Sequence, residues 1–138
     1  MEIVFYAFDH IDIEVNHECQ HGTIDQSALD FHFDMWESDA QQTINYLLFL
    51  DIAKTKKQFA TSPYRISASF LAQIAFPQPD LFTASDIQGE KQRILLEGAG
   101  IAYCALQASI TTFTKGCLNG EVLIPDIDLA KFIQYEGQ

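Results

Sequence analysis

Strict alternation of apolar and polar residues dominates the first half of this chain. Near its start, Ile11, Ile13 and Val15 would face one side of an extended backbone. Asp12 and Glu14 would face the other side. A period of two residues is that of a β-strand with one buried face. The pattern recurs in three later segments, residues 29–35, 44–52 and 64–76. Because four strands follow one another, we expect an antiparallel sheet with one more polar face.

The period changes in the second half of the chain. After a segment with two prolines, apolar residues recur at spacings of three and four, which is the pattern of an amphipathic helix. This stripe consists of Leu95, Ala99, Ala102, Leu106, Ile110 and Phe113. The helix would begin near Asp86 and end at Gly116. Within it, Gly98 and Gly100 would mark a bend or the close approach of another helix backbone.

A second, shorter helix is expected at the end of the chain. Asp128 would cap this helix, which would carry Leu129, Phe132 and Ile133. Four strands followed by two helices predict an α+β fold, in which a long helix and a short C-terminal helix pack on one face of a four-stranded antiparallel sheet. The length is that of one domain, so we expect a single domain over residues 1–138.

The connection between the two expected helices is too apolar for an ordinary loop. Loops generally run over the surface and carry polar residues. This connection instead contains Leu118, Val122, Leu123, Ile124 and Pro125. It must therefore either lie on a core or line a groove that receives something apolar.

The chain is strongly acidic, with 19 acidic and 8 basic side chains and a net charge of −11. Such a charge repels phosphate backbones, so we expect basic partners and no nucleic-acid binding. Because no run of about 18 apolar residues is present, we expect no membrane span. The start of the chain has no basic segment typical of a signal peptide, so we expect a cytoplasmic location.

The cysteines and nearby histidines do not form a recognisable metal site. Cys19, Cys104 and Cys117 are odd in number and widely spaced, which is typical of free thiols in a reducing compartment. His17, Cys19 and His21 could ligate zinc, but a closed structural site needs four ligands and no fourth ligand is evident. We therefore interpret this polar stretch as a solvated loop without a metal.

No catalytic motif is recognisable either, and we expect neither enzymatic activity nor a cofactor. The sequence has no glycine-rich phosphate loop and no nucleophile–base pair at a familiar spacing. His32 could form an acid–base pair with Asp30 or Asp34. Alternation would place all three in water rather than in a cleft, where perturbed catalytic groups are usually found.

Two further groups of strand residues each have two interpretations. Acidic side chains of the first two strands would cluster on the polar sheet face if these strands were neighbours. The cluster would be a docking patch for a basic partner or an ordinary solvated face. Trp36, Leu47 and Phe49 would face away from the long helix. They would form a packed cluster or subunit interface, or an exposed platform for a client chain.

The segment from Lys115 to Tyr135 resembles the C-terminal part of SecB, a family of bacterial export chaperones. The matching residues are Lys115, Gly116, Leu118, Leu123, Pro125, Ala130, Phe132 and Tyr135. Residues 11–14 (IDIE) resemble the first-strand segment of that family, and the order of elements and the acidic charge agree with it. The chain departs from the family at residues 98–109, which lack its helix signature. It also departs at Ser69, where the family has a glutamate that helps to bind the motor protein SecA.

The resemblance implies an ATP-independent chaperone that holds unfolded or partly folded polypeptides for protein export and assembles as a tetramer, a dimer of dimers. Clients would bury apolar side chains in a groove formed by Val4, Tyr6, Phe8, Trp36, Phe49, Leu118, Val122 and Ile124. A basic partner, SecA or an antitoxin, would dock on Asp12, Glu14, Asp30 and Asp34. Small residues of the long helix would form the oligomer interface, namely Gly98, Ala99, Gly100 and Ala102.

Two other functions are compatible with the sequence. The chain could be a SecB-like protein that binds one specific partner, for example an antitoxin. It could also be a small-molecule-binding or enzymatic protein of hot-dog-like shape, in which a long helix likewise lies on an antiparallel sheet. A hot-dog protein usually has this helix within its strand order, whereas here the helix follows all four strands, which counts against the second function.

Overall fold

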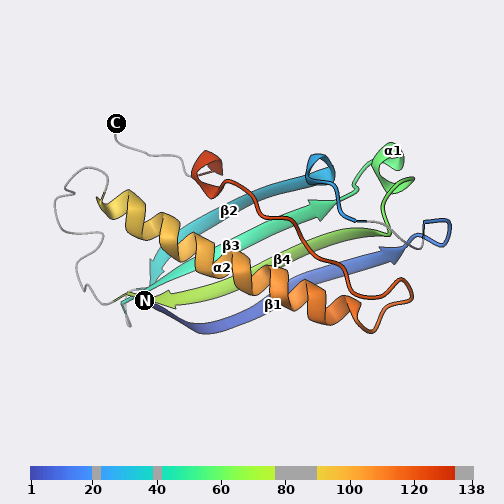
Figure 1. Ribbon diagram of the computed structural model, residues 1–138. Coiled ribbons are helices and arrows are strands. Elements are labelled where there is room, and N and C mark those ends of the chain that lie inside the picture. The colour runs from blue at the N-terminus through green and yellow to red at the C-terminus, as the bar shows by residue number, and fades with distance from the viewer. Residues whose placement is uncertain (20–22, 39–41, 77–89, 133–138) are drawn as a thin grey trace.

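One helix lies across one face of a four-stranded antiparallel sheet (Figure 1). The computed structural model describes residues 1–19, 23–38, 42–76 and 90–132. The strands are β1 (Glu2–Val15), β2 (Leu29–Ser38), β3 (Thr43–Ile52) and β4 (Tyr64–Ala75). The long helix is α2 (Glu90–Thr114), and a 3-10 helix, η2 (Leu129–Phe132), follows it. The predicted fold class is confirmed, although the described part of the final helix is this single 3-10 turn.

The strands lie in the order β1-β4-β3-β2, so that the first two strands occupy opposite edges of the sheet. The chain crosses from one edge to the other through residues 16–28, which include a 3-10 helix, η1 (Gln26–Ala28). β1 is irregular, with shifts of register between Ile3 and Phe5 and between Phe8 and His10. Such bulges bend and twist an edge strand. Consequently, β1 leaves one long edge of the sheet that pairs with no other described strand.

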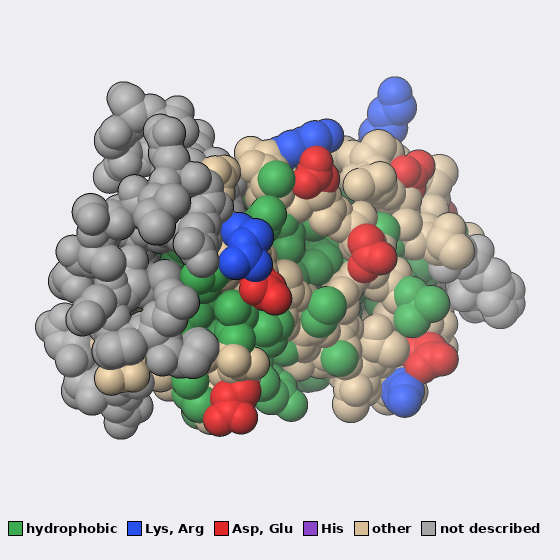
Figure 2. All heavy atoms as spheres, turned by 60° about the vertical axis from the view of Figure 1, so that its left-hand side comes forward, with side chains coloured by type: hydrophobic (Ala, Val, Ile, Leu, Met, Phe, Trp, Pro, Cys, Tyr) green, Lys and Arg blue, Asp and Glu red, His purple; other side chains and the backbone are tan. Residues whose placement is uncertain are grey.

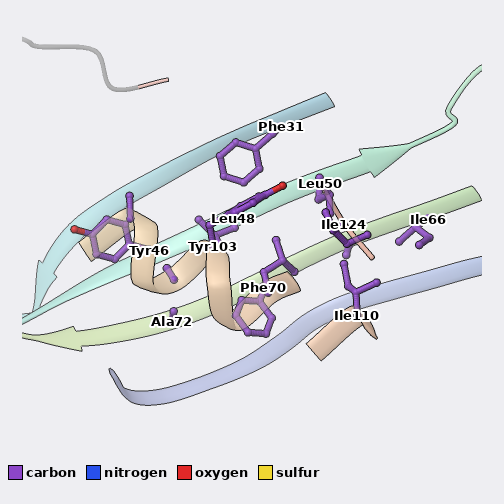
Figure 3. Close-up of a cluster of buried hydrophobic side chains, with 14 of the residues drawn as sticks. Phe31, Tyr46, Leu48, Leu50, Ile66, Phe70, Ala72, Tyr103, Ile110 and Ile124 are labelled. Carbon is purple, nitrogen blue, oxygen red and sulfur yellow. The ribbon is translucent and has the colours of Figure 1, made fainter. Parts of the chain in front are cut away.

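The core lies between α2 and the inner face of the sheet (Figure 3). β3 and β4 contribute alternate residues, as the sequence predicts, and the largest of these are Tyr46, Leu48, Leu50, Ile66 and Phe70. From the predicted helix stripe, Leu95, Ala99, Ala102, Leu106 and Ile110 are buried. Phe113 is 49% exposed, so its place in the stripe was wrong. The buried face of α2 instead continues through Thr114 and also includes Tyr103.

Gly98 marks the closest approach of α2 to the sheet. A Cβ atom at this position would lie 2.4 Å from the Tyr46 hydroxyl oxygen and 2.9 Å from the Phe76 ring. The Tyr46 hydroxyl donates a hydrogen bond of 2.8 Å to the carbonyl of Leu95. Close approach of another helix backbone was one explanation suggested by the sequence, whereas the atoms next to Gly98 belong to the side chains of Tyr46 and Phe76. Gly100 has open space around the same position.

Three parts of the sequence prediction differ from the structure or fall outside it. The lysine-rich turn after β3 contains a short helix, α1 (Lys56–Phe59), which Thr55 and Gln58 cap reciprocally in a capping box. The predicted helix start near Asp86 lies outside the described residues, as do Ile133 and Tyr135. Asp128 does cap the last turn, because its carboxylate accepts a hydrogen bond from the backbone N–H of Ala130.

α2 is also the one described helix that is long and apolar enough to cross a membrane, over residues Gln92–Thr114. Its inward side packs on β1, β3 and β4. A core helix of a soluble protein has the same length and composition as a membrane span when it is largely buried. The packing of α2 on the sheet therefore accounts for the buried part of this span, which is 44% of it.

Candidate functional site

The apolar connection after α2 lies on the core, and its residues alternate between buried and exposed. Val122 and Ile124 are buried against the sheet and helix, whereas Leu123 between them is 74% exposed. Leu118 is 70% exposed. We call residues 121–127 the strap, because they cross the inner face of the sheet without forming a helix or strand. Figure 1 shows this segment running from the end of α2 towards β2.

Side chains of α2 hold the strap by its backbone. The hydroxyl of Tyr103 donates to the carbonyl of Pro125 at 2.7 Å, and the amide of Gln107 donates to that of Ile124 at 2.9 Å. One turn later, the hydroxyl of Thr111 donates to the carbonyl of Val122 at 2.9 Å. These three donors are four residues apart along α2, so they lie on one face of the helix.

The remaining contacts fix both ends of the strap. The buried Thr114 hydroxyl accepts a hydrogen bond of 3.0 Å from the backbone N–H of Val122. At the other end, the amide of Gln107 also donates to the Asp126 carboxylate at 2.9 Å. Burial, together with the nearby Asp126 charge, raises the pKa of the Tyr103 hydroxyl. Tyr103 therefore stays protonated and remains a hydrogen-bond donor at any physiological pH.

A second group of exposed apolar side chains lies in the first half of β1, on both faces of the sheet, since Phe5 pairs with Gln73 and Tyr6 with the core residue Ala72. Val4, Phe5 and Tyr6 are each about half exposed. Tyr6 reaches back to the Phe70 ring with a centroid distance of 5.8 Å, and Phe8 packs on the same ring at 5.1 Å. Because no described strand pairs with the outer edge of β1, its free backbone groups accompany these side chains.

The structure does not bring the eight predicted groove residues together. Tyr6 and Phe8 lie on the inner face of the sheet, because their partners in β4 are core residues. Trp36 and Phe49 lie on the outer face, opposite Asn45 and His32 respectively. The two strap residues of the prediction, described above, are core residues rather than exposed ones. The prediction of one continuous groove through all eight positions is therefore wrong for this conformation.

The predicted acidic docking patch is also divided. Asp12 and Glu14 belong to β1 and Asp30 and Asp34 to β2, and two strands separate these edges. The assumption that the first two strands are neighbours was wrong. However, Asp51 of β3 lies between them, and the sequence prediction did not include this residue.

The register aligns three of these carboxylates in one row across the outer sheet face. Asp12 and Asp51 both pair with Ser67 of β4, and Asp51 pairs directly with Asp30. Like charges directly opposite one another destabilise a sheet. Lys54 lies 3.5 Å from Asp30 and offsets part of this repulsion. We call Asp12, Asp51 and Asp30 the acidic row.

Other predicted charges have partners within the chain. Glu14 forms an ion pair of 2.8 Å with Arg65, whose guanidinium also stacks 4.4 Å from the centre of the Phe59 ring. His32 stacks on Phe49 with ring centres 4.5 Å apart, a contact that the sequence analysis did not foresee. Figure 2 shows that charged side chains are scattered over this view and that hydrophobic side chains lie exposed between them.

Three of the four predicted oligomer-interface residues face the sheet. Ala99 and Ala102 are fully buried, and Gly98 is packed against Tyr46. Only Gly100 points into open space. The assignment of Gly98, Ala99 and Ala102 to a subunit contact was therefore wrong, because the close packing that these small residues permit occurs inside one chain.

The described residues contain no cluster of side chains that could bind a metal ion. No three His, Cys, Asp or Glu side chains in these residues are arranged to hold a metal ion. His17 and Cys19 are described, whereas His21 of the same stretch is not. Cys19, Cys104 and Cys117 are free thiols, as predicted.

Comparisons with known proteins bear on the fold. No protein-family model and no curated protein matches the sequence. Among solved structures, the chain is similar to the SecB-like chaperone Rv1957 of Mycobacterium tuberculosis in complex with a ChAD peptide from the antitoxin HigA1 (Rv1956). The TM-score is 0.61 at 10% identity, with 92% of this chain and 89% of that chain covered.

A protein of unknown function from Streptococcus agalactiae is also similar, with a TM-score of 0.39, 14% identity, and coverage of 91% of this chain and 98% of that one. At 10% identity, the similarity to Rv1957 concerns the fold alone. The four-stranded sheet, long helix and terminal 3-10 turn of this chain match the fold of that neighbour.

Proposed function

We propose that this chain is a chaperone-like protein that binds extended or partly folded polypeptide segments without ATP. The observation that supports it most directly is the first half of β1, where three half-exposed apolar side chains accompany an unpaired strand edge. Monomeric soluble proteins rarely expose such residues together without a partner. The SecB-like fold, and the peptide carried by its neighbour, support the same proposal.

Binding would combine two physical contributions. An extended client can add backbone hydrogen bonds to a free strand edge, which gives affinity without dependence on sequence. Its apolar side chains would be buried against Val4, Phe5 and Tyr6, which gains roughly 25 cal/mol per Å². The net charge of −11 would keep the complex soluble and favour basic clients.

The proposal is tested by measuring whether the purified chain suppresses the aggregation of several unrelated unfolded proteins, with an equal mass of an acidic non-chaperone protein as control. We expect suppression near stoichiometric amounts and without ATP. Suppression for a single client or an antitoxin segment alone would select a dedicated partner-binding protein. If no client is held and no partner peptide binds, the proposal is wrong.

We also propose assembly into a homotetramer in the cytoplasm. From Gly98 to Thr114 the sequence contains no charged residue, although the exposed side of α2 includes Cys104, Ala108 and Thr112. Uncharged helix surface of this length is typical of a subunit contact. Light scattering at micromolar concentration should give four times the chain mass of 15.6 kDa, and a monomer would contradict the assembly.

A basic partner, for which SecA or an antitoxin are the candidates, would dock on the acidic row. Removing one of the opposed charges by Asp51→Asn should raise the free energy of unfolding by about 0.2–1 kcal/mol at low salt. The same change should weaken binding of an oligolysine probe. Glu37→Gln is the control, because it removes one charge from β2 on the other sheet face. Equal losses of binding in both variants would contradict a localised row.

A further inference from the structure

The strap covers a part of the core beside α2. α2 packs mainly on β1, β3 and β4 and touches β2 through the edge-on contact of Tyr103 with Phe31, and the strap and η2 lie next to it on the side of β2. One contact places the strap there and another places η2: the Gln26 side chain before β2 donates to the carbonyl of Asp126 in the strap, and Phe132 of η2 stacks edge-on against Phe31. The strap thus lies in a channel with α2 on one side and the β2 edge on the other.

The channel contacts the strap in two ways. Side chains of α2 bind its backbone carbonyls, and the core receives two of its apolar side chains. Tyr103, Gln107 and Thr111 each donate to a strap carbonyl, a group that every polypeptide possesses, and Gln107 donates to the Asp126 carboxylate as well. Specificity comes from two alternate aliphatic residues, Val122 and Ile124, which enter the core. An extended segment of another polypeptide with the same apolar alternation would present the same groups to the channel.

The strap is held less firmly than the strands around it. No backbone–backbone hydrogen bond from residues 121–127 to another described segment is formed. Its contacts are side-chain hydrogen bonds, the ion pair of Glu121 with Lys115 at 3.9 Å, the burial of Val122 and Ile124, and the partial burial of Ile127. Segments with few backbone hydrogen bonds open locally at lower free energy than a sheet does.

We propose that the channel between α2 and β2 is a peptide-binding site and that the strap is its displaceable occupant. A client segment with aliphatic residues at alternate positions takes the place of Val122 and Ile124 once the strap leaves. This inference rests on the proposed function and assigns the chemistry of a bound segment. It also makes the strap an internal competitor, whose release increases binding.

The test uses the full chain and a fluorescent peptide with the sequence of residues 119–128 (NGEVLIPDID) as the probe. The double variant Val122→Ser, Ile124→Ser loosens the strap but leaves the channel side chains intact. We expect it to bind the probe at least tenfold more tightly than the unmodified chain does. Leu123→Ser, which changes the exposed strap residue between them, should leave the affinity unchanged. A probe with serine at the positions of Val122 and Ile124 should not bind.

Hydrogen exchange on the unmodified chain provides a second measurement that does not depend on the folding of a variant. With saturating probe, amides of residues 121–127 should exchange faster and those of β2 should not. Unchanged strap exchange, or no gain of affinity in a folded double variant, would overturn the inference even if the chain holds clients. Conversely, probe binding with strap release in a chain that holds no unfolded protein would support the channel and reject the general chaperone function.

Discussion

The Gly98→Ala chain should be less stable than the Gly100→Ala chain by about 1–3 kcal/mol, because an added methyl group at Gly98 meets an interior that cannot accommodate it. The Tyr46 hydroxyl would be 2.4 Å from the new Cβ atom. Tyr46 is fully buried and its hydroxyl is bonded to the carbonyl of Leu95, so the ring has no free direction of movement. The helix must therefore shift away from β3.

Gly100→Ala is a matched control in the same helix. Both substitutions gain about 1 kcal/mol of helix propensity, so the difference between them isolates the contact with Tyr46. Because Gly100 has no atom within 4 Å of the added position, its variant should be more stable than the unmodified chain. The free energies of unfolding come from urea titrations. Equal stabilisation by both substitutions would show that the sheet and helix do not approach one another as closely as described.

The strands and the long helix of this chain could be predicted because the spacing of apolar residues within each element shows which face is buried. The alternation of Ile44, Tyr46 and Leu48 assigns one face of β3 without any knowledge of its neighbours. The spacing of Ala99, Ala102 and Leu106 does the same for α2. In both cases the structure buries those residues, because one-sided burial is a property of the element itself.

The candidate sites could not be predicted to the same extent, because they depend on the order of the strands. The pattern of β1 is the same whether it pairs with β2 or with β4, and the register that aligns Asp12 with Asp51 needs both neighbours. For the same reason, small residues such as Ala99 and Ala102 suggested a subunit contact. Sequence spacing shows that two surfaces approach closely, but it does not show whether the second surface belongs to the same chain.

The connection after α2 illustrates a prediction with two alternatives, of which the structure shows the first. The sequence required this apolar connection to lie on a core or to line a groove. Val122 and Ile124 lie on the core, and Leu123 and Leu118 remain exposed. The signal that distinguishes them is alternation, as in a strand, which continues through a segment that forms no strand. The polar residues of α2 that bind its backbone could also have been found, since Tyr103, Gln107 and Thr111 recur every four residues.

The double variant Val4→Asp, Phe5→Asp should lose client binding by at least tenfold. Each side chain is 49% exposed, so a client can still bury about half of its surface, which is worth about 1–1.5 kcal/mol for each residue. A tenfold change in affinity corresponds to about 1.4 kcal/mol, so the loss of both contacts should exceed that factor. Two added charges on the strand edge also disfavour pairing with another chain.

A matched variant separates the β1 surface from the connection after α2. Leu118→Asp with Leu123→Asp adds the same charge at the two most exposed large apolar residues described. These residues have no free strand edge beside them, so their exposure alone offers a client only side-chain contact. We therefore expect this variant to hold clients as well as the unmodified chain does. Aggregation assays on both folded variants decide the question. If the β1 variant still holds clients and the Leu118, Leu123 variant does not, the client site lies at the connection after α2. Apolar contact there would then contribute more to binding than the backbone edge of β1.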